Sequence, residues 1–186
     1  MAATTVLLAL LSPILTAQAA PGEKTAPNAA QAAADAAEMA KALTPADKKF
    51  IKEATESLYF ELAIAEVAIR RNRPVGAGRD STRQLADRLH PELQKAWEEL
   101  SKFAQAKNEK VRDELSGGEK RDVEEIRSVA IEKFHKEVTG LLGKMAKQVA
   151  QTFASSSIQH PVLKKIAARH APTFNQHVTE IVQAAK

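Results

Sequence analysis

The sequence predicts an all-α protein, and three observations support this prediction. Aromatic residues make up only 4% of the 186 residues, there are seven glycines, and good helix formers such as Ala, Glu, Lys and Leu are abundant. The sequence contains no run of alternating Val, Ile and Thr of the kind that is typical of a strand. Apolar residues recur every three or four positions in four long segments, which predicts an antiparallel four-helix bundle.

The segment before these helices predicts export. Residues 1–19 form an apolar run that is too short to span a bilayer and ends in the small-x-small pattern Ala17-Gln-Ala19. We interpret this run as a signal peptide cleaved before Ala20, although no Lys or Arg precedes it; a short buried helix is the alternative. The chain has no cysteine, so the exported protein must fold without disulfides. Residues 20–43 are predicted to be an Ala-rich linker, transiently helical from 31 to 43, before a bundle domain at 44–186.

The first long helix has a well-defined start. Thr44 is a capping residue, Pro45 occupies a position where no amide hydrogen is needed, and Asp47 favours the positive end of the helix dipole. An apolar stripe follows from Phe50 onward, with Glu61 beside it. Proline and glycines between residues 73 and 78 are expected to end the helix.

The second helix is predicted over residues 81–107. Its apolar stripe continues in phase across Pro91, although that proline removes a backbone hydrogen bond directly after His90. We therefore expect one kinked helix rather than two shorter ones. Trp97 lies on the stripe and is predicted to be a core residue.

The last two helices complete the bundle. One continuous periodic segment is predicted over residues 119–153, in which Gly140 and Gly143 favour close helix approach. The final helix is predicted to begin at Pro161 and to contain a second internal proline, Pro172. Short links between these helices favour antiparallel neighbours.

Three histidines have a carboxylate one helical turn away, on the same helix face. Imidazole and carboxylate groups together are typical ligands of iron, manganese or zinc in helix bundles. If the four helices bring these groups and Glu61 together, the candidate ligands are Glu61, Asp87, His90, Glu132, His135 and His177.

A structural interpretation of the same residues is favoured over the metal centre. Asp87 and Glu132 are flanked by basic residues, so salt bridges at the surface explain both carboxylates. The histidines are then expected to be buried or half-buried, with hydrogen bonds to Glu61 or to each other. His160 and His170 have no such acidic partner and are predicted to lie at the surface, with helix capping as a second explanation for His160 before Pro161.

Arginines crowd the link between the first two helices. Arg70, Arg71, Arg73 and Arg79, with Arg83 and Arg88 nearby, are candidates for contact with an anionic lipid surface, glycan or phosphate. A solvated junction partly neutralised by Asp80 and Asp87 is the favoured alternative. No aromatic residues alternate with these arginines, and the net charge is only +4, so nucleic acid is not an expected partner.

Four short motifs resemble the bacterial domain of unknown function 4142 family. They are Glu61 within residues 60–68, His90 ahead of Leu93 and Trp97, His135 within residues 134–138, and the closing Pro172-Thr-x-x-x-His177. The resemblance covers about 44–185 and implies an exported protein with a ferritin-like four-helix bundle. The chain departs from the family pattern at Leu89 and Phe134, where an Asp usually precedes the histidine, and in a shorter loop between the second and third helices.

No activated nucleophile, glycine-rich phosphate loop or dinucleotide motif is present, so conventional enzyme chemistry is not expected. Two functions are left open. The favoured one is a non-enzymatic periplasmic module, related to binding or stress survival, that recognises an envelope partner, lipid or small ligand. The alternative is a ferritin-like metal-binding or redox protein.

Overall fold

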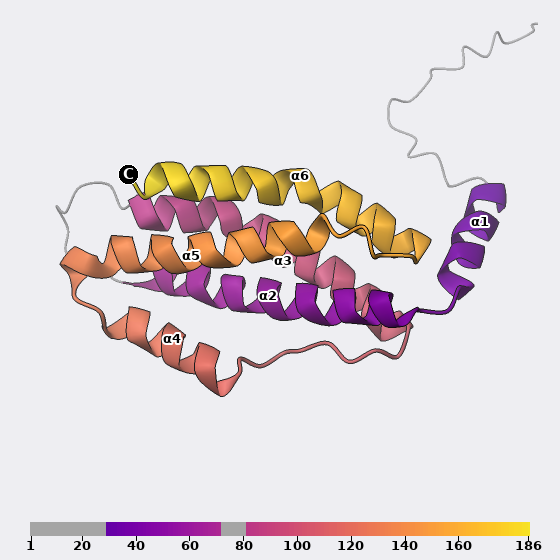
Figure 1. The fold of residues 1–186 in the computed structure, drawn as a ribbon, viewed down its shortest axis with the longest axis horizontal. Coiled ribbons are helices and arrows are strands. Elements are labelled where there is room, and N and C mark those ends of the chain that lie inside the picture. Colours follow the sequence, from indigo (N-terminus) through magenta and orange to yellow (C-terminus); the bar gives the residue numbers. More distant parts are fainter. Residues whose placement is uncertain (1–28, 72–80) are drawn as a thin grey trace, which may run out of the picture.

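The computed structural model describes residues 29–71 and 81–186, and every regular element in these two ranges is a helix (Figure 1). The elements are α1 (Ala29–Ala40), α2 (Pro45–Arg70), α3 (Ser81–Ala106), α4 (Gly117–Ser128), α5 (Ile131–Phe153) and α6 (Pro161–Ala184). The all-α prediction is therefore confirmed for this part of the chain. The predicted signal peptide lies outside the described residues. No described helix is long and apolar enough to cross a membrane.

The long helices α2, α3, α5 and α6 enclose a common apolar core. Helix α2 packs against α3 and α5, and α6 packs against the same two helices. Figure 1 shows α2 and α6 running in one direction and α3 and α5 in the opposite direction. Fully buried side chains come from all four helices, among them Leu58, Leu93, Leu142 and Phe174. Each neighbouring pair of long helices is thus antiparallel.

Helix α2 begins as the sequence predicts. The Thr44 hydroxyl accepts a hydrogen bond from the Asp47 amide, and the Asp47 carboxylate accepts one from the Thr44 amide, which completes a capping box. The other carboxylate oxygen of Asp47 accepts bonds from the amides of Gln159 and His160, at 2.7 and 3.0 Å. Burial alone would raise the pKa of Asp47, but these hydrogen bonds lower it to about 2. One buried carboxylate therefore joins the starts of α2 and α6.

The single helix predicted over residues 119–153 is wrong, because two helices, α4 and α5, occupy this segment. Val129 and Ala130 between them have extended backbones. The guanidinium of Arg71 donates hydrogen bonds to the carbonyls of Ile126 and Val129. Those carbonyls would bond to amides one turn later in a continuous helix, so Arg71 stabilises the break.

The helices predicted through Pro91 and Pro172 are present, and the structure adds a helix in the predicted linker. Helix α3 runs through Pro91 and α6 runs through Pro172 without interruption. The predicted linker contains a defined helix, α1. The Lys107 ammonium donates to the carbonyls of Met39 and Lys41 at the carboxyl end of α1 and so attaches that end to the bundle.

Candidate functional site

Glu61 is fully buried in the middle of α2. Neither of its carboxylate oxygens has a hydrogen-bond partner among the described residues. Burial raises its pKa to about 8, because the charged form loses its hydration without gaining a compensating contact. Glu61 is therefore mostly protonated at neutral pH, and the predicted hydrogen bond between Glu61 and a histidine is wrong.

His177 is the second interior group that lacks a partner. It lies on α6 with its ring edge-on to Phe174, and its Nδ1 has no hydrogen-bond partner in the described part of the chain. Burial lowers the pKa of His177, and the nearby carboxylates of Glu180 and Glu92 only partly oppose this effect. The imidazole is thus held neutral in the core.

His135 is engaged at both ring nitrogens. Its Nε2 lies 2.8 Å from the carbonyl oxygen of Ala184, and its Nδ1 lies 2.7 Å from the hydroxyl of Thr82. A carbonyl only accepts, so Nε2 carries a proton and donates to Ala184, while Nδ1 pairs with the hydroxyl of Thr82. His135 therefore connects the beginnings of α3 and α5 with the end of α6, and neither nitrogen is free to bind an ion.

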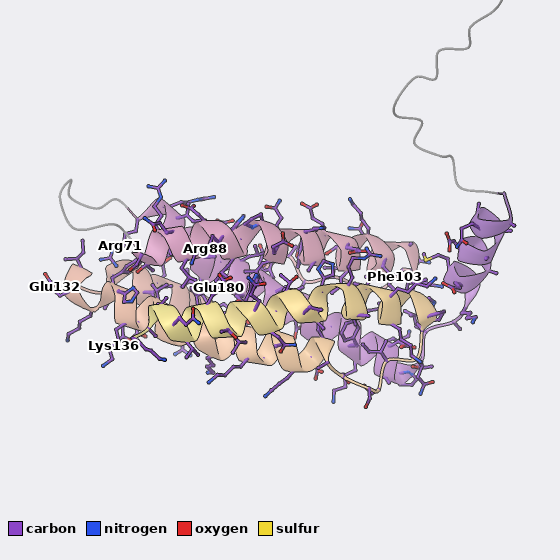
Figure 2. The ribbon with its side chains drawn as sticks, turned by 90° about the horizontal axis from the view of Figure 1, so that it is seen from above. Arg71, Arg88, Phe103, Glu132, Lys136 and Glu180 are labelled. Carbon is purple, nitrogen blue, oxygen red and sulfur yellow. The ribbon has the colours of Figure 1, made fainter. Side chains whose placement is uncertain are left out.

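The remaining candidate ligands lie at or near the surface. Asp87 is exposed and pairs with Arg83 at 3.7 Å. Glu132 is exposed at one end of the bundle (Figure 2). His90 is half-buried, 4.0 Å from the carboxylate of Glu66.

The six candidate ligands are consequently not brought together. Within the described ranges, no group of three or more Asp, Glu or His side chains is placed to hold a metal ion. Metal binding by these residues stays a prediction. The carboxylate one turn from His177, Glu180, instead points towards Arg88 across α3 and α6, at 3.5 Å (Figure 2).

The arginines predicted to contact anions have different roles. Arg70 pairs with Glu66 at 3.1 Å on the surface of α2. Arg71 donates hydrogen bonds to the carbonyls at the end of α4, and its guanidinium carbon lies 4.1 Å from the ring centre of Phe134. Arg73 and Arg79 lie outside the described residues. Two of these four predicted arginines are thus described, and of the two only Arg70 is exposed and makes no hydrogen bond to a backbone carbonyl.

His160 and His170 are buried, at 2% and 3% exposure, so their predicted surface position is wrong. His160 caps α6 by accepting from the amide of Val162, and its ring packs edge-on against Phe103. His170 bonds to the Glu99 carboxylate at 2.8 Å and stacks on Phe174. Each histidine is stabilised by residues far away in sequence, which spacing along a single helix does not reveal.

A groove on the outer side of the α2–α3 pair is lined by both aromatic and polar side chains. Its volume is about 270 Å³, and its lining residues are Tyr59, Leu62, Ala63, Glu66, His90, Gln94, Trp97 and Leu115. The α2 residues lie at positions i, i+3, i+4 and i+7 of one face, and the α3 residues at i, i+4 and i+7, so two facing helix stripes build it. We call this site the Tyr59–Trp97 groove.

Aromatic rings and polar groups converge in the Tyr59–Trp97 groove. The rings of Tyr59 and Trp97 lie 5.8 Å apart at an interplanar angle of 40°. The carboxylate of Glu66 faces His90 at 4.0 Å, and the Gln94 amide donates to Glu98 at 2.9 Å. Apolar walls with a few directed polar groups are typical of small-molecule sites. The groove was not predicted from the sequence, where a core position was favoured for Trp97 over stacking on a ligand.

Comparison with known proteins places the chain in a family. The profile of the family described as Domain of unknown function (DUF4142) matches residues 28–184. The chain belongs to this family. The predicted resemblance is therefore confirmed, although the DUF4142 family carries no assigned activity in its description.

The fold of this DUF4142 protein also occurs in a solved structure. A crystal structure of a DUF305 fragment from Deinococcus radiodurans matches with a TM-score of 0.65 and 11% identity, covering 78% of this chain and 98% of that chain. At this identity the likeness concerns the fold alone. No curated protein matches the sequence.

Proposed function

We propose that this DUF4142 protein is an exported, non-enzymatic module of the cell envelope that binds a small ligand in the Tyr59–Trp97 groove. The groove is the single observation that carries the proposal. It combines two aromatic rings, a carboxylate–imidazole pair and an amide in about 270 Å³ on one side of the bundle. A role in envelope stress survival fits such a module.

Export is supported by the apolar run at residues 1–19 and the small-x-small pattern before Ala20. The test is amino-terminal sequencing of the protein recovered from the periplasmic fraction of a cell expressing the full chain. A first residue of Ala20 supports export with cleavage at this position. An intact Met1 in a protein recovered only from the cytosol contradicts it.

The architecture suits a ferritin-like four-helix bundle. Two antiparallel helix pairs, α2–α3 and α5–α6, are joined by one long connection that contains α4. One long crossover between two such pairs is the connectivity of ferritin-like bundles. The metal-binding alternative that often accompanies this fold has less support, because Asp87 and Glu132 lie at the surface and His135 uses both ring nitrogens.

Ligand binding in the groove is tested by filling it. Ala63 lines the groove and is half-buried, so Ala63→Met places extra side-chain volume inside it. Ala171→Met on α6 is the matched control, since Ala171 is also half-buried but lies outside the groove. A screen of small polar and aromatic compounds by calorimetry should find ligands for the wild type and the control, and none for Ala63→Met. Ligands that bind all three proteins equally would contradict the proposal.

A further inference from the structure

The Tyr59–Trp97 groove lacks the Lys and Arg side chains that line other hollows of the described surface. The chain has a net charge of +4, yet the groove lining contains one carboxylate, Glu66, and no Lys or Arg among the described residues. Four other hollows on the described surface each include basic side chains beside one or more carboxylates: Arg70, Arg71 and Arg127; Lys102, Lys165 and Arg169; Lys49; and Lys133 and Lys144.

A second carboxylate is hydrogen-bonded to a residue that lines the groove. Gln94 lines the groove and donates a hydrogen bond from its amide nitrogen to Glu98, one turn along α3, at 2.9 Å. The Glu98 side chain is thereby directed towards Gln94. The groove and its rim thus combine two acidic groups with two aromatic rings.

From this combination we propose that the groove binds a small organic cation, such as a quaternary or alkylated ammonium headgroup. This inference rests on the proposed function of the same groove. The faces of aromatic rings attract cations electrostatically, and indole is the strongest of these faces. Tyr59 and Trp97 both line the groove, with their rings tilted by 40° to one another.

Glu66 supplies a negative charge at one end of the groove. Its side chain is 44% exposed and faces the groove from the end opposite Tyr59 on the same α2 stripe. Its present partners, Arg70 and His90, lie at 3.1 and 4.0 Å. Both contacts are at the surface, where ion pairs contribute little, so a bound cation can displace them. The small volume favours a single headgroup over a larger ligand.

The experiment uses three probes of nearly equal shape: choline, its neutral carbon isostere neohexanol, and the anion tert-butylacetate. Trp97 is the only tryptophan in the sequence, so its emission reports directly on the groove. Titrations of the full mature protein are followed by this emission and, independently, by calorimetry. We expect saturable binding of choline, at least ten-fold weaker binding of neohexanol, and no binding of tert-butylacetate.

Charge variants complete the test. Glu66→Gln should weaken choline binding about ten-fold or more and leave neohexanol binding unchanged. Glu53→Gln is the control, because Glu53 is an exposed α2 carboxylate outside the groove. Equal binding of choline and neohexanol, or tighter binding of tert-butylacetate, overturns the cation inference but leaves the groove as a ligand site. If none of the three binds and the compound screen also finds no ligand blocked by Ala63→Met, both proposals fail.

Discussion

The hydroxyl of Thr82 lies 2.7 Å from Nδ1 of His135, within hydrogen-bonding distance. Thr82 is fully buried, and its hydrogen bond fixes the ring that also donates to the carbonyl of Ala184. His135 is therefore a structural residue that joins three helices. Its place in the family-like motif is explained by this cross-link without a bound metal.

His135→Ala should lower the free energy of unfolding by about 2 kcal/mol, because a buried hydroxyl and a carbonyl lose their partners. Urea denaturation at pH 7 measures this change. Glu132→Ala, one turn away and exposed, should change it by less than about 0.5 kcal/mol. Metal analysis of protein purified without an affinity tag is the second readout. Near-stoichiometric metal that is lost only in His135→Ala would contradict the structural role.

Glu61→Gln should change the pH dependence of stability. The pKa of Glu61 is raised from 4.5 to about 8 in the folded protein, so the native state binds more protons than the unfolded state between these values. Stability from this group is complete below pH 4.5 and is lost as pH rises towards and through 8. At pH 7 the penalty relative to pH 4.5 is about 3 kcal/mol.

The variant and the wild type should therefore be similarly stable at pH 4.5, with Glu61→Gln the more stable by several kcal/mol at pH 8. Urea denaturation across this pH range measures the free energy of unfolding of both proteins. The difference between the two values isolates Glu61, because the contributions of the other carboxylates cancel. Glu53→Gln, at an exposed position of the same helix, should follow the wild type. A parallel decline of Glu61→Gln and wild type would refute the burial of an ionisable group.

Arg71→Met should loosen α4 without unfolding the bundle. Arg71 holds the carbonyls of Ile126 and Val129, and its guanidinium packs over Phe134. Only Val123 and Ile126 of α4 are buried, so little else holds this helix in place. Hydrogen exchange should become faster across residues 117–128 and stay unchanged in α2 and α6. Arg70→Met, which removes only a surface pair, should leave α4 protected.

Gly140→Ala should stabilise the protein by up to about 1 kcal/mol, the usual difference in helix propensity. A Cβ at Gly140 would meet no atom within 4 Å, whereas one at Gly143 would lie 3.4 Å from a methyl group of Ile181. Gly143→Ala should therefore gain less. Thermal unfolding of both variants measures the two effects, and a destabilised Gly140→Ala would show that α5 needs this glycine. The expectation that both glycines permit close approach fits only Gly143.

The parts of the fold that local rules control could be predicted from the sequence. The Thr44–Asp47 cap and the helices on either side of Pro91 and Pro172 follow from nearby residues. The break before α5 could not be predicted, because Arg71 stabilises it from more than 50 positions away. The position of this break therefore depends on a contact between residues distant in sequence, which local sequence patterns do not show.

The candidate site was harder to predict for the same reason. Spacing on one helix correctly places His177 on the inward face and puts Glu61 beside the apolar stripe, but it does not show whether the helix faces converge. The Tyr59–Trp97 groove exists only because the outer stripes of α2 and α3 meet in antiparallel register. The positions of Tyr59, Ala63 and Glu66, one turn apart beside the core stripe, were the available signal.

The central claim, that the Tyr59–Trp97 groove binds a small organic cation, is tested most directly by the indole N–H resonance of Trp97 in a two-dimensional NMR spectrum. The chain has one tryptophan, so this signal is single and needs no assignment by mutation. Choline should shift it saturably in the wild type and in Ala171→Met, but not in Ala63→Met. A resonance that stays fixed while choline shifts backbone signals around Phe103 or Arg71 instead would contradict the account.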